Sequence, residues 1–304
     1  MIFNRVLHLF VFVILNIASF SLFAIDVNNQ NTVLIIGGAK NIGKEIATEF
    51  AKAGWDVWVT SRDVSEKYRY EISRYKIRAL KLDITNHDQV KKIVDKVYKE
   101  SGKINVLVNN AGYGLLGSSE AVTIDQIKKQ FDVNFYGPVH VIQEVLPIMR
   151  QQGGGCIINI SSTSAVRSVP GLGMYAASKM ALEGFSEALA AEVAPWNIKV
   201  SVVQPATVKN NWIDHCVYGK KKTISEYKLL AINLDKTLRG RLEKGQEQSE
   251  VGKLVFNIVT TNEPHFRYQT GEQSISIAKE VYVDPAGDYM KNKMIELADG
   301  LYKR

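Results

Sequence analysis

The sequence has little cysteine, no internal repeat and no low-complexity tract. Its two cysteines, Cys156 and Cys216, form no CxxC or Cys/His cluster, so no zinc or other metal site is predicted. One disulfide is compatible with the count, but a buried thiol at Cys156 and an exposed thiol at Cys216 is the simpler interpretation. The lack of repeats and polar tracts excludes a solenoid and a disordered chain, so 304 residues with 46% hydrophobic content predict a packed globular protein.

The sequence also lacks a concentrated basic surface. The net charge is +7, yet the lysines and arginines are scattered, apart from the run at 220–222, and aromatic residues are not interleaved with them. Nucleic acid is therefore not predicted as a partner. The positive excess is typical of a solvated surface, with a few cations left for a phosphate-rich cofactor.

The first 25 residues differ from the rest. Arg5 precedes an apolar stretch over residues 9–25, which only three polar residues interrupt. This pattern is typical of a secretory signal peptide cleaved near Ala24, and equally of an uncleaved membrane anchor. Both interpretations predict a protein that is membrane-associated or exported. A polar linker over residues 26–31 follows.

Residues 32–304 read as one folded domain. Short apolar runs alternate with longer amphipathic segments over about residues 32–205, which is a βαβ rhythm of strands covered by helices on both faces. The predicted class is α/β, a doubly wound parallel sheet of Rossmann type in a single domain. The rhythm lapses after Pro205, and residues of about 207–245 are predicted to form a helical lid where ligands bind in such sheets.

A glycine-bearing turn joins the first strand to the first helix. Its residues are Gly37, Lys40, Asn41, Ile42 and Gly43. Small residues let the backbone approach a pyrophosphate, the helix N-terminus favours negative charge, and Asn41 can tolerate a positive φ. An ordinary strand-to-helix turn can have the same sequence pattern, so the turn predicts dinucleotide binding only together with other motifs.

The end of the second strand indicates which dinucleotide is preferred. Ser61 stands where an acidic residue would bind the ribose of NAD, and Arg62 follows it. Lys40 lies in the turn on the same side of the nucleotide. Two cations could therefore converge on a 2′-phosphate, and NADP(H) is predicted over NAD(H).

Tyr175 and Lys179 are the candidates for acid–base chemistry. They are four residues apart in a helical segment and so share one face. A neighbouring ammonium and an oxidised nicotinamide are expected to lower the pKa of Tyr175 from about 10. Ser162 ends an apolar strand 13 residues earlier, 175 − 162, where its hydroxyl could stabilise a developing alkoxide.

These motifs resemble the short-chain dehydrogenase/reductase family over nearly all of residues 32–290. Its glycine turn, strand-four NNAG motif (109–112) and catalytic Asn, Ser, Tyr and Lys appear in order, the last four as Asn134, Ser162, Tyr175 and Lys179. The resemblance implies that Asn134 positions a water behind Lys179, and that Lys179 holds the nicotinamide ribose. It also implies a homodimer or homotetramer. The further cofactor contacts that it implies are Asp83, Asn110, Ala111, Gly112, Pro205 and Val208.

The sequence departs from the family pattern around the cofactor. Ile36 and Asn41 replace a usual Thr and Gly, Ala206 replaces a Gly, and Asn210 stands where a Thr often contacts the nicotinamide amide. None of these changes removes a catalytic group. They bear on cofactor affinity and on nicotinamide orientation.

The C-terminal part resembles the branch that includes retinol dehydrogenases and estradiol 17β-dehydrogenase, through PHFRYQT (264–270) and YVDPAG (282–287). That branch implies a bulky apolar alcohol or ketone as substrate, with retinoids, steroids, 3-keto lipids and xenobiotic carbonyls as options. Predicted substrate contacts are Ser162, Val169, Met174, Trp212, His215 and Tyr218.

The predicted function is hydride transfer between NADP(H) and a carbonyl or alcohol. A non-catalytic NADP(H)-binding redox sensor or scaffold is the alternative, and an epimerase or dehydratase on the same fold is another.

Overall fold

The computed structural model describes residues 30–64, 76–220 and 224–281, together with residues 286, 288 and 292. From Asn31 onward these residues belong to one compact unit. The predicted signal peptide or anchor at 1–25 lies outside the described residues, as do most of the linker and most of YVDPAG. No helix in the described ranges is long and apolar enough to cross a membrane.

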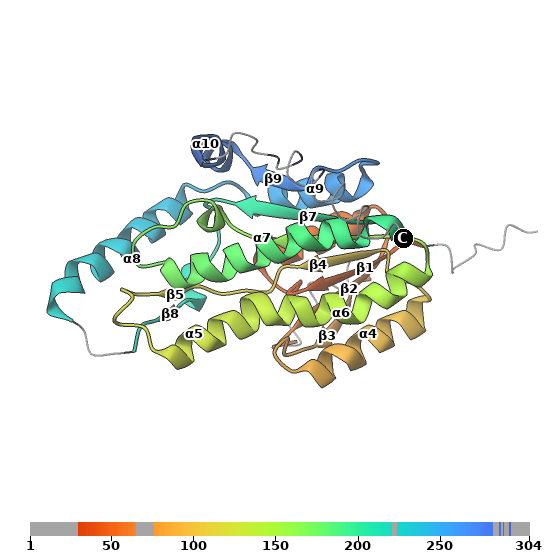
Figure 1. The fold of residues 1–304 in the computed structure, drawn as a ribbon, viewed down its shortest axis with the longest axis horizontal. Helices are drawn as coiled ribbons and strands as arrows, with labels where there is room; N and C mark the ends of the chain where they lie inside the picture. The colour runs from red at the N-terminus through yellow and green to blue at the C-terminus, as the bar shows by residue number, and fades with distance from the viewer. Residues whose placement is uncertain are drawn as a thin grey trace, which may run out of the picture. The chain divides into compact units, whose positions relative to one another are not determined.

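Seven parallel strands form the central sheet in the order β3-β2-β1-β4-β6-β7-β9 (Figure 1). Their bounds are β1 (Thr32–Ile36), β2 (Asp56–Ser61), β3 (Arg78–Lys81), β4 (Val106–Asn109), β6 (Gly155–Ile160), β7 (Ile198–Pro205) and β9 (Arg267–Thr270). In register, Val33 pairs with Val57 of β2 on one side and with Val106 of β4 on the other. The order reverses direction between β1 and β4, which creates a ligand crevice at the carboxyl ends of these strands.

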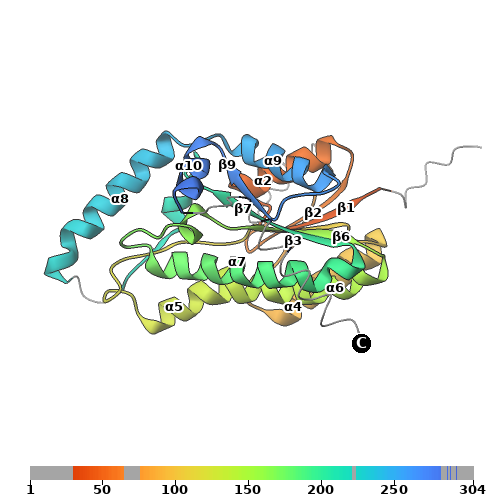
Figure 2. The same ribbon diagram turned by 45° about the horizontal axis from the view of Figure 1, so that its top comes forward.

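Helices cover both faces of the sheet (Figure 2). One face carries α4 (His87–Ser101), α6 (Gly137–Gln151) and α7 (Gly173–Val193), and the other carries α2 (Asn41–Lys52) and α9 (Gln248–Thr260). Two further helices are α5 (Ile124–Phe131), which leads into α6, and α10 (Glu272–Val281), which follows β9. The predicted doubly wound α/β fold is confirmed.

The sequence explains this layering. The central strands are apolar on both sides, as in β1, whose five residues are all buried, because helices cover both faces of a parallel sheet. The helices begin at polar caps: the Asn86 side chain accepts a hydrogen bond from the Gln89 N–H (3.0 Å) at the start of α4. Thr123 and Gln126 form a capping box at α5.

The segment between β7 and α9 covers the carboxyl ends of the strands. Its described elements are a 3₁₀ turn (Trp212–His215), the short strand β8 (Val217–Tyr218), a second 3₁₀ turn (Ser225–Tyr227) and α8 (Lys228–Glu243). β8 pairs in parallel with β5 (Leu115–Leu116), which lies just after the NNAG motif. One ion pair joins α8 to the 3₁₀ turn, since Arg239 contacts Asp214 at 2.9 Å, and within the helix Arg239 also contacts Asp235 at 2.9 Å.

Candidate active site

The glycine turn after β1 is held in one conformation. Gly37 has φ 80° and Asn41 has φ 52°, so the predicted positive φ at Asn41 is confirmed. A Cβ at Gly37 would lie 2.8 Å from the backbone nitrogen of Ala111. The Asn110 side chain donates to the Gly37 carbonyl at 2.7 Å. The hydrogen bond from Asn110, just after β4, therefore holds the turn in place. Gly37 has no side chain that would cover its backbone.

A cavity of about 470 Å³ opens above this turn, a size typical of ligand sites. Its wall contains most of the residues predicted from the sequence: Gly37, Lys40, Asn41, Ile42, Arg62, Asp83, Asn110, Ala111, Gly112, Ser162, Val169, Tyr175, Lys179, Pro205, Val208, Trp212 and His215. Four predicted contacts do not line it, namely Gly43, Asn134, Met174 and Tyr218. Gly43 is buried beneath the turn and Asn134 lies behind Tyr113, whereas the Tyr218 hydroxyl donates to Asp235 at 2.6 Å.

Asp83 lines the cavity and is held as a carboxylate. Its Oδ1 accepts hydrogen bonds from the Thr85 hydroxyl (2.7 Å) and the Thr85 N–H (3.0 Å), and these bonds lower the pKa of Asp83. Lys40 and Arg62 are both exposed at the cavity edge. Within the described ranges neither makes an ion pair, but the charge of Arg62 contributes to the lowered pKa of Asp83.

Tyr175 lies at the floor of the cavity and is only 8% exposed. Its ring packs against Trp212 with centroids 5.4 Å apart, and the Ser162 side chain lies near enough to affect its pKa. Burial raises the pKa of Tyr175 to about 12, and the nearby Ser162 side chain partly opposes this shift. The lowering expected from Lys179 together with an oxidised nicotinamide does not occur in the protein alone, because desolvation of the phenolate outweighs the other effects.

Lys179 is buried beside Tyr175 on α7, as the four-residue spacing predicts. Its Nζ donates to the Ile160 carbonyl at 2.7 Å, which fixes the ammonium at the end of β6. Burial lowers the pKa of Lys179 to about 8, and the negative charge of Glu183 opposes this shift. Lys179 is therefore the group in the cavity whose charge changes just above neutral pH.

Asn134 lies in a π-helix (Asp132–Tyr136) between α5 and α6. Its amide donates to the Tyr113 carbonyl (3.0 Å) and to Ser178 Oγ (3.1 Å), and its Oδ1 accepts from the Tyr113 N–H (3.1 Å). A Cβ on Gly112 would lie 3.2 Å from Asn134 Oδ1 and 3.4 Å from Lys179 Nζ. The two polar groups therefore flank Gly112. Such single π turns often occur at functional sites, but the sequence shows only a helical run here.

The outer wall of the cavity is mainly apolar. Its apolar residues include Val169, Leu172 and Trp212, with Leu238 and Leu242 of α8, and all five belong to one packed cluster. Sequence reasoning missed the leucines, because nothing in the lid segment signals which face of α8 turns inward. It also missed two cations in the wall, Arg167 and Arg241; Arg167 is paired with Glu280.

Both cysteines are free. Cys156 is buried as predicted, and burial raises its pKa to about 12. Cys216 is half-buried rather than exposed, because it packs against Gly114, and its thiol donates to the Trp212 carbonyl at 3.5 Å. In the described part of the chain, no group of three or more His, Cys, Asp or Glu side chains could hold a metal ion.

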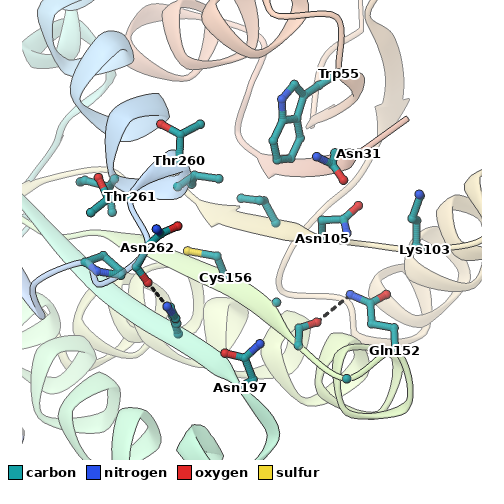
Figure 3. A pocket seen from close by; sticks show the side chains of 18 residues that line it. Asn31, Trp55, Lys103, Asn105, Gln152, Cys156, Asn197, Thr260, Thr261 and Asn262 are labelled. Atoms are coloured by element: carbon teal, nitrogen blue, oxygen red, sulfur yellow. Dashed lines mark hydrogen bonds between the residues drawn. The ribbon is translucent and has the colours of Figure 1, made fainter. Parts of the chain in front are cut away.

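A second hollow opens at the opposite, amino-terminal ends of the strands (Figure 3). Its polar side chains bind neighbouring backbone: Gln152 donates to the Gly154 carbonyl at 2.9 Å, and Asn105 accepts from the Thr32 N–H at 2.8 Å. These bonds hold loops in place. The chemistry is therefore assigned to the cavity around Tyr175.

Comparisons with known proteins show the family of this chain. The model of the short chain dehydrogenase family matches residues 31–215. The 3-ketodihydrosphingosine reductase of Bacteroides thetaiotaomicron is 35% identical over 79% of this chain and 87% of its own length. Human retinol dehydrogenase 8 is 30% identical over 84% of this chain and 86% of its own.

The solved structure of ElxO with NADP bound has a TM-score of 0.66 and 25% identity, covering 81% of this chain and 99% of that one. Members of the matching family are oxidoreductases that act on the CH–OH groups of small molecules with a nicotinamide cofactor. With its glycine turn, its Ser-Tyr-Lys floor and these relatives, the chain belongs to the short-chain dehydrogenase/reductase family and resembles its retinol dehydrogenase branch.

Proposed function

We propose that this protein is an NADP(H)-dependent oxidoreductase whose substrate is a lipophilic ketone, aldehyde or alcohol. The observation that carries the proposal is the placement of the Tyr175 and Ser162 hydroxyls at the floor of a cavity with an apolar outer wall. A polar floor can bind one reacting oxygen, and the apolar wall can cover the hydrocarbon beyond it.

The residues present fit a dinucleotide. A Cβ at Gly37 would contact Ala111, and a Cβ at Gly43 would lie 2.6 Å from Asn110 Nδ2. Because neither glycine has a side chain, the turn can pack closely against the helix while its backbone stays accessible. The N-terminus of α2 follows immediately, and its free N–H groups suit a pyrophosphate. When bound, the nicotinamide supplies or accepts the hydride.

The chain's own groups handle the substrate oxygen and the proton. In reduction, the Tyr175 O–H donates its proton to the carbonyl oxygen, and the Ser162 hydroxyl donates a hydrogen bond to the same oxygen. A pKa of about 12 keeps Tyr175 protonated at neutral pH, which favours its role as a donor. The Lys179 ammonium stabilises the tyrosinate that remains.

The pH profile tests this assignment. Because the pKa of Lys179 is lowered to about 8, the ammonium is present below that pH and lost above it. We expect kcat/KM for reduction to be level near neutral pH and to fall above about pH 8. Rates at saturating NADPH from about pH 6 to pH 10 measure this. A profile that stays level up to the highest pH would contradict it.

Cofactor preference is expected to depend on Arg62. Replacing it by alanine removes a cation that can bind the 2′-phosphate, so the Kd for NADPH should rise about ten-fold, while the Kd for NADH stays unchanged. Fluorescence titration with each cofactor measures both constants. Lys52→Ala is the matched control, because Lys52 is exposed at the far end of α2 and pairs with Glu49. Equal weakening of both cofactors by Arg62→Ala would refute the preference.

The names of the relatives suggest which substrates to try. One relative reduces 3-ketodihydrosphingosine and another is a retinol dehydrogenase, and both names denote long apolar molecules with one reacting oxygen. We therefore expect turnover of a long-chain 3-keto lipid, a retinal or a ketosteroid. NADPH absorbance followed with purified residues 26–304, alongside small aldehydes, ranks these classes. Tight NADPH binding without turnover of any of them, or of the matching alcohols with NADP⁺, would favour the sensor or scaffold alternative.

We further propose that residues 1–25 attach the protein to a membrane or direct its export, which suits a substrate that partitions into lipid. Fractionation of the full chain and of residues 26–304 tests this. Assembly with further copies is also proposed, supported by the exposed Tyr136 and Met180. Light scattering measures that assembly.

A further inference from the structure

A buried carboxylate lies one helical turn beyond Lys179. Glu183 of α7 is only 4% exposed and faces three donors. Its Oε1 accepts from Ser161 Oγ at 2.5 Å, both oxygens accept from Gln204 Nε2 at 2.9 Å, and Oε2 accepts from Arg267 Nε at 3.3 Å. A buried carboxylate is stable only when it is bonded and balanced in this way.

The partners of Glu183 come from three neighbouring strands, and two of them adjoin the site. Ser161 directly precedes Ser162 at the end of β6, and Gln204 directly precedes Pro205 at the end of β7. Gln204 is itself fixed, because its Oε1 accepts from Gln269 Nε2 at 2.7 Å. The carboxylate therefore ties the ends of two site-forming strands to the helix that carries Tyr175 and Lys179.

Glu183 also supplies a negative charge that acts on Lys179 and raises its pKa. The two residues are four apart on α7, and both are buried, so little water screens their attraction. Other groups near Lys179 include the neutral Asn134, the Ile160 carbonyl and the protonated Tyr175. The charged groups that face Glu183 are Lys179 and Arg267, and Arg267 also contacts Glu187 at 2.7 Å.

We propose that Glu183 is a positioning residue that keeps the Lys179 ammonium charged and fixes the Ser161–Ser162 strand end beneath the substrate oxygen. It touches neither the substrate nor the cofactor. The inference rests on the proposed function only for the role given to Lys179. The effect of Glu183 on the charge of Lys179 concerns the protein without ligand and does not depend on that function.

The test is a direct titration of Lys179. Full-length protein with ¹³C-labelled lysine is titrated by NMR, and the Lys179 signal is identified by its loss in Lys179→Arg. Glu183→Gln keeps the shape of the side chain and removes its charge, so the Lys179 midpoint is expected to move about one pH unit lower. The alkaline fall of kcat/KM should move with it.

Glu187→Gln is the matched control, because it removes the other carboxylate of Arg267 from the same helix, one turn farther from Lys179. It is expected to leave the Lys179 midpoint in place. Equal shifts in the two variants, or no shift in Glu183→Gln, would overturn the proposal. A lower melting temperature of Glu183→Gln with an unchanged midpoint would show a purely structural residue.

A second variant covers the case in which Glu183→Gln does not fold. Arg267→Gln keeps the Glu183 carboxylate and removes the cation that competes with Lys179 for it, so the midpoint is expected to move higher. An unchanged or lower midpoint in this variant overturns the proposal. None of these titrations requires turnover, so a failure to find a substrate would leave their result intact.

Discussion

Replacing Tyr175 by phenylalanine is expected to lower kcat/KM for carbonyl reduction about 10³-fold, because the variant keeps the buried ring but has no proton to donate. The ring still packs against Trp212, so the melting temperature and the Kd for NADPH should change little. Steady-state rates with the best substrate of the panel, together with fluorescence titration of NADPH, measure the two effects separately.

Tyr98→Phe provides the control for this variant. Tyr98 is an exposed residue of α4, away from the cavity, and the loss of its hydroxyl is expected to leave the rate unchanged. Tyr175→Phe with near-normal turnover would show that another group supplies the proton. A rate lost in step with NADPH affinity would instead indicate a damaged site.

Gly43→Ala is expected to weaken NADPH binding about ten- to hundred-fold. The added Cβ would press on the Gly37 carbonyl and lie 2.6 Å from Asn110 Nδ2, so the turn must open or Asn110 must release it. Overpacking of this kind costs about 1–3 kcal/mol, which accounts for the expected loss of affinity. Fluorescence titration gives the Kd, and thermal unfolding shows how much of the strain is also felt without ligand.

The matched control is Gly184→Ala on the exposed side of α7. A Cβ there meets nothing within 4 Å, and alanine is the better helix former, so this variant should bind NADPH normally and melt at the same or a slightly higher temperature. If Gly43→Ala also binds NADPH normally, the turn does not approach the pyrophosphate as proposed.

Local patterns predicted those parts of the site that depend on short sequence spacing. The glycine turn, the strand ends and the shared face of Tyr175 and Lys179 all follow from backbone geometry over a few residues. The positive φ of Asn41 follows in the same way from its short polar side chain.

Features that depend on tertiary packing could not be read from the sequence. The pKa of Tyr175 moves upward because of burial, and burial is set by the lid and the sheet together. The π-helix at Asn134 and the inward face of α8 have no sequence signature of their own. Met174, which precedes Tyr175, is a predicted substrate contact, but it does not line the cavity. The role of Glu183 could not be predicted for the same reason, because its hydrogen-bond partners are distant in the chain.

The pairing of β8 with β5 divides the segment between β7 and α9 into two parts that differ in how readily their sequence can be replaced. Trp212 and His215 lie before β8, on chain that this pairing holds against the core. Leu238, Arg241 and Leu242 lie beyond it on α8, which belongs to neither sheet. Replacing α8 alone should therefore change which hydrocarbon substrate is preferred without disturbing the chemistry at Tyr175. This helix is the part to replace when the enzyme is engineered for a different substrate.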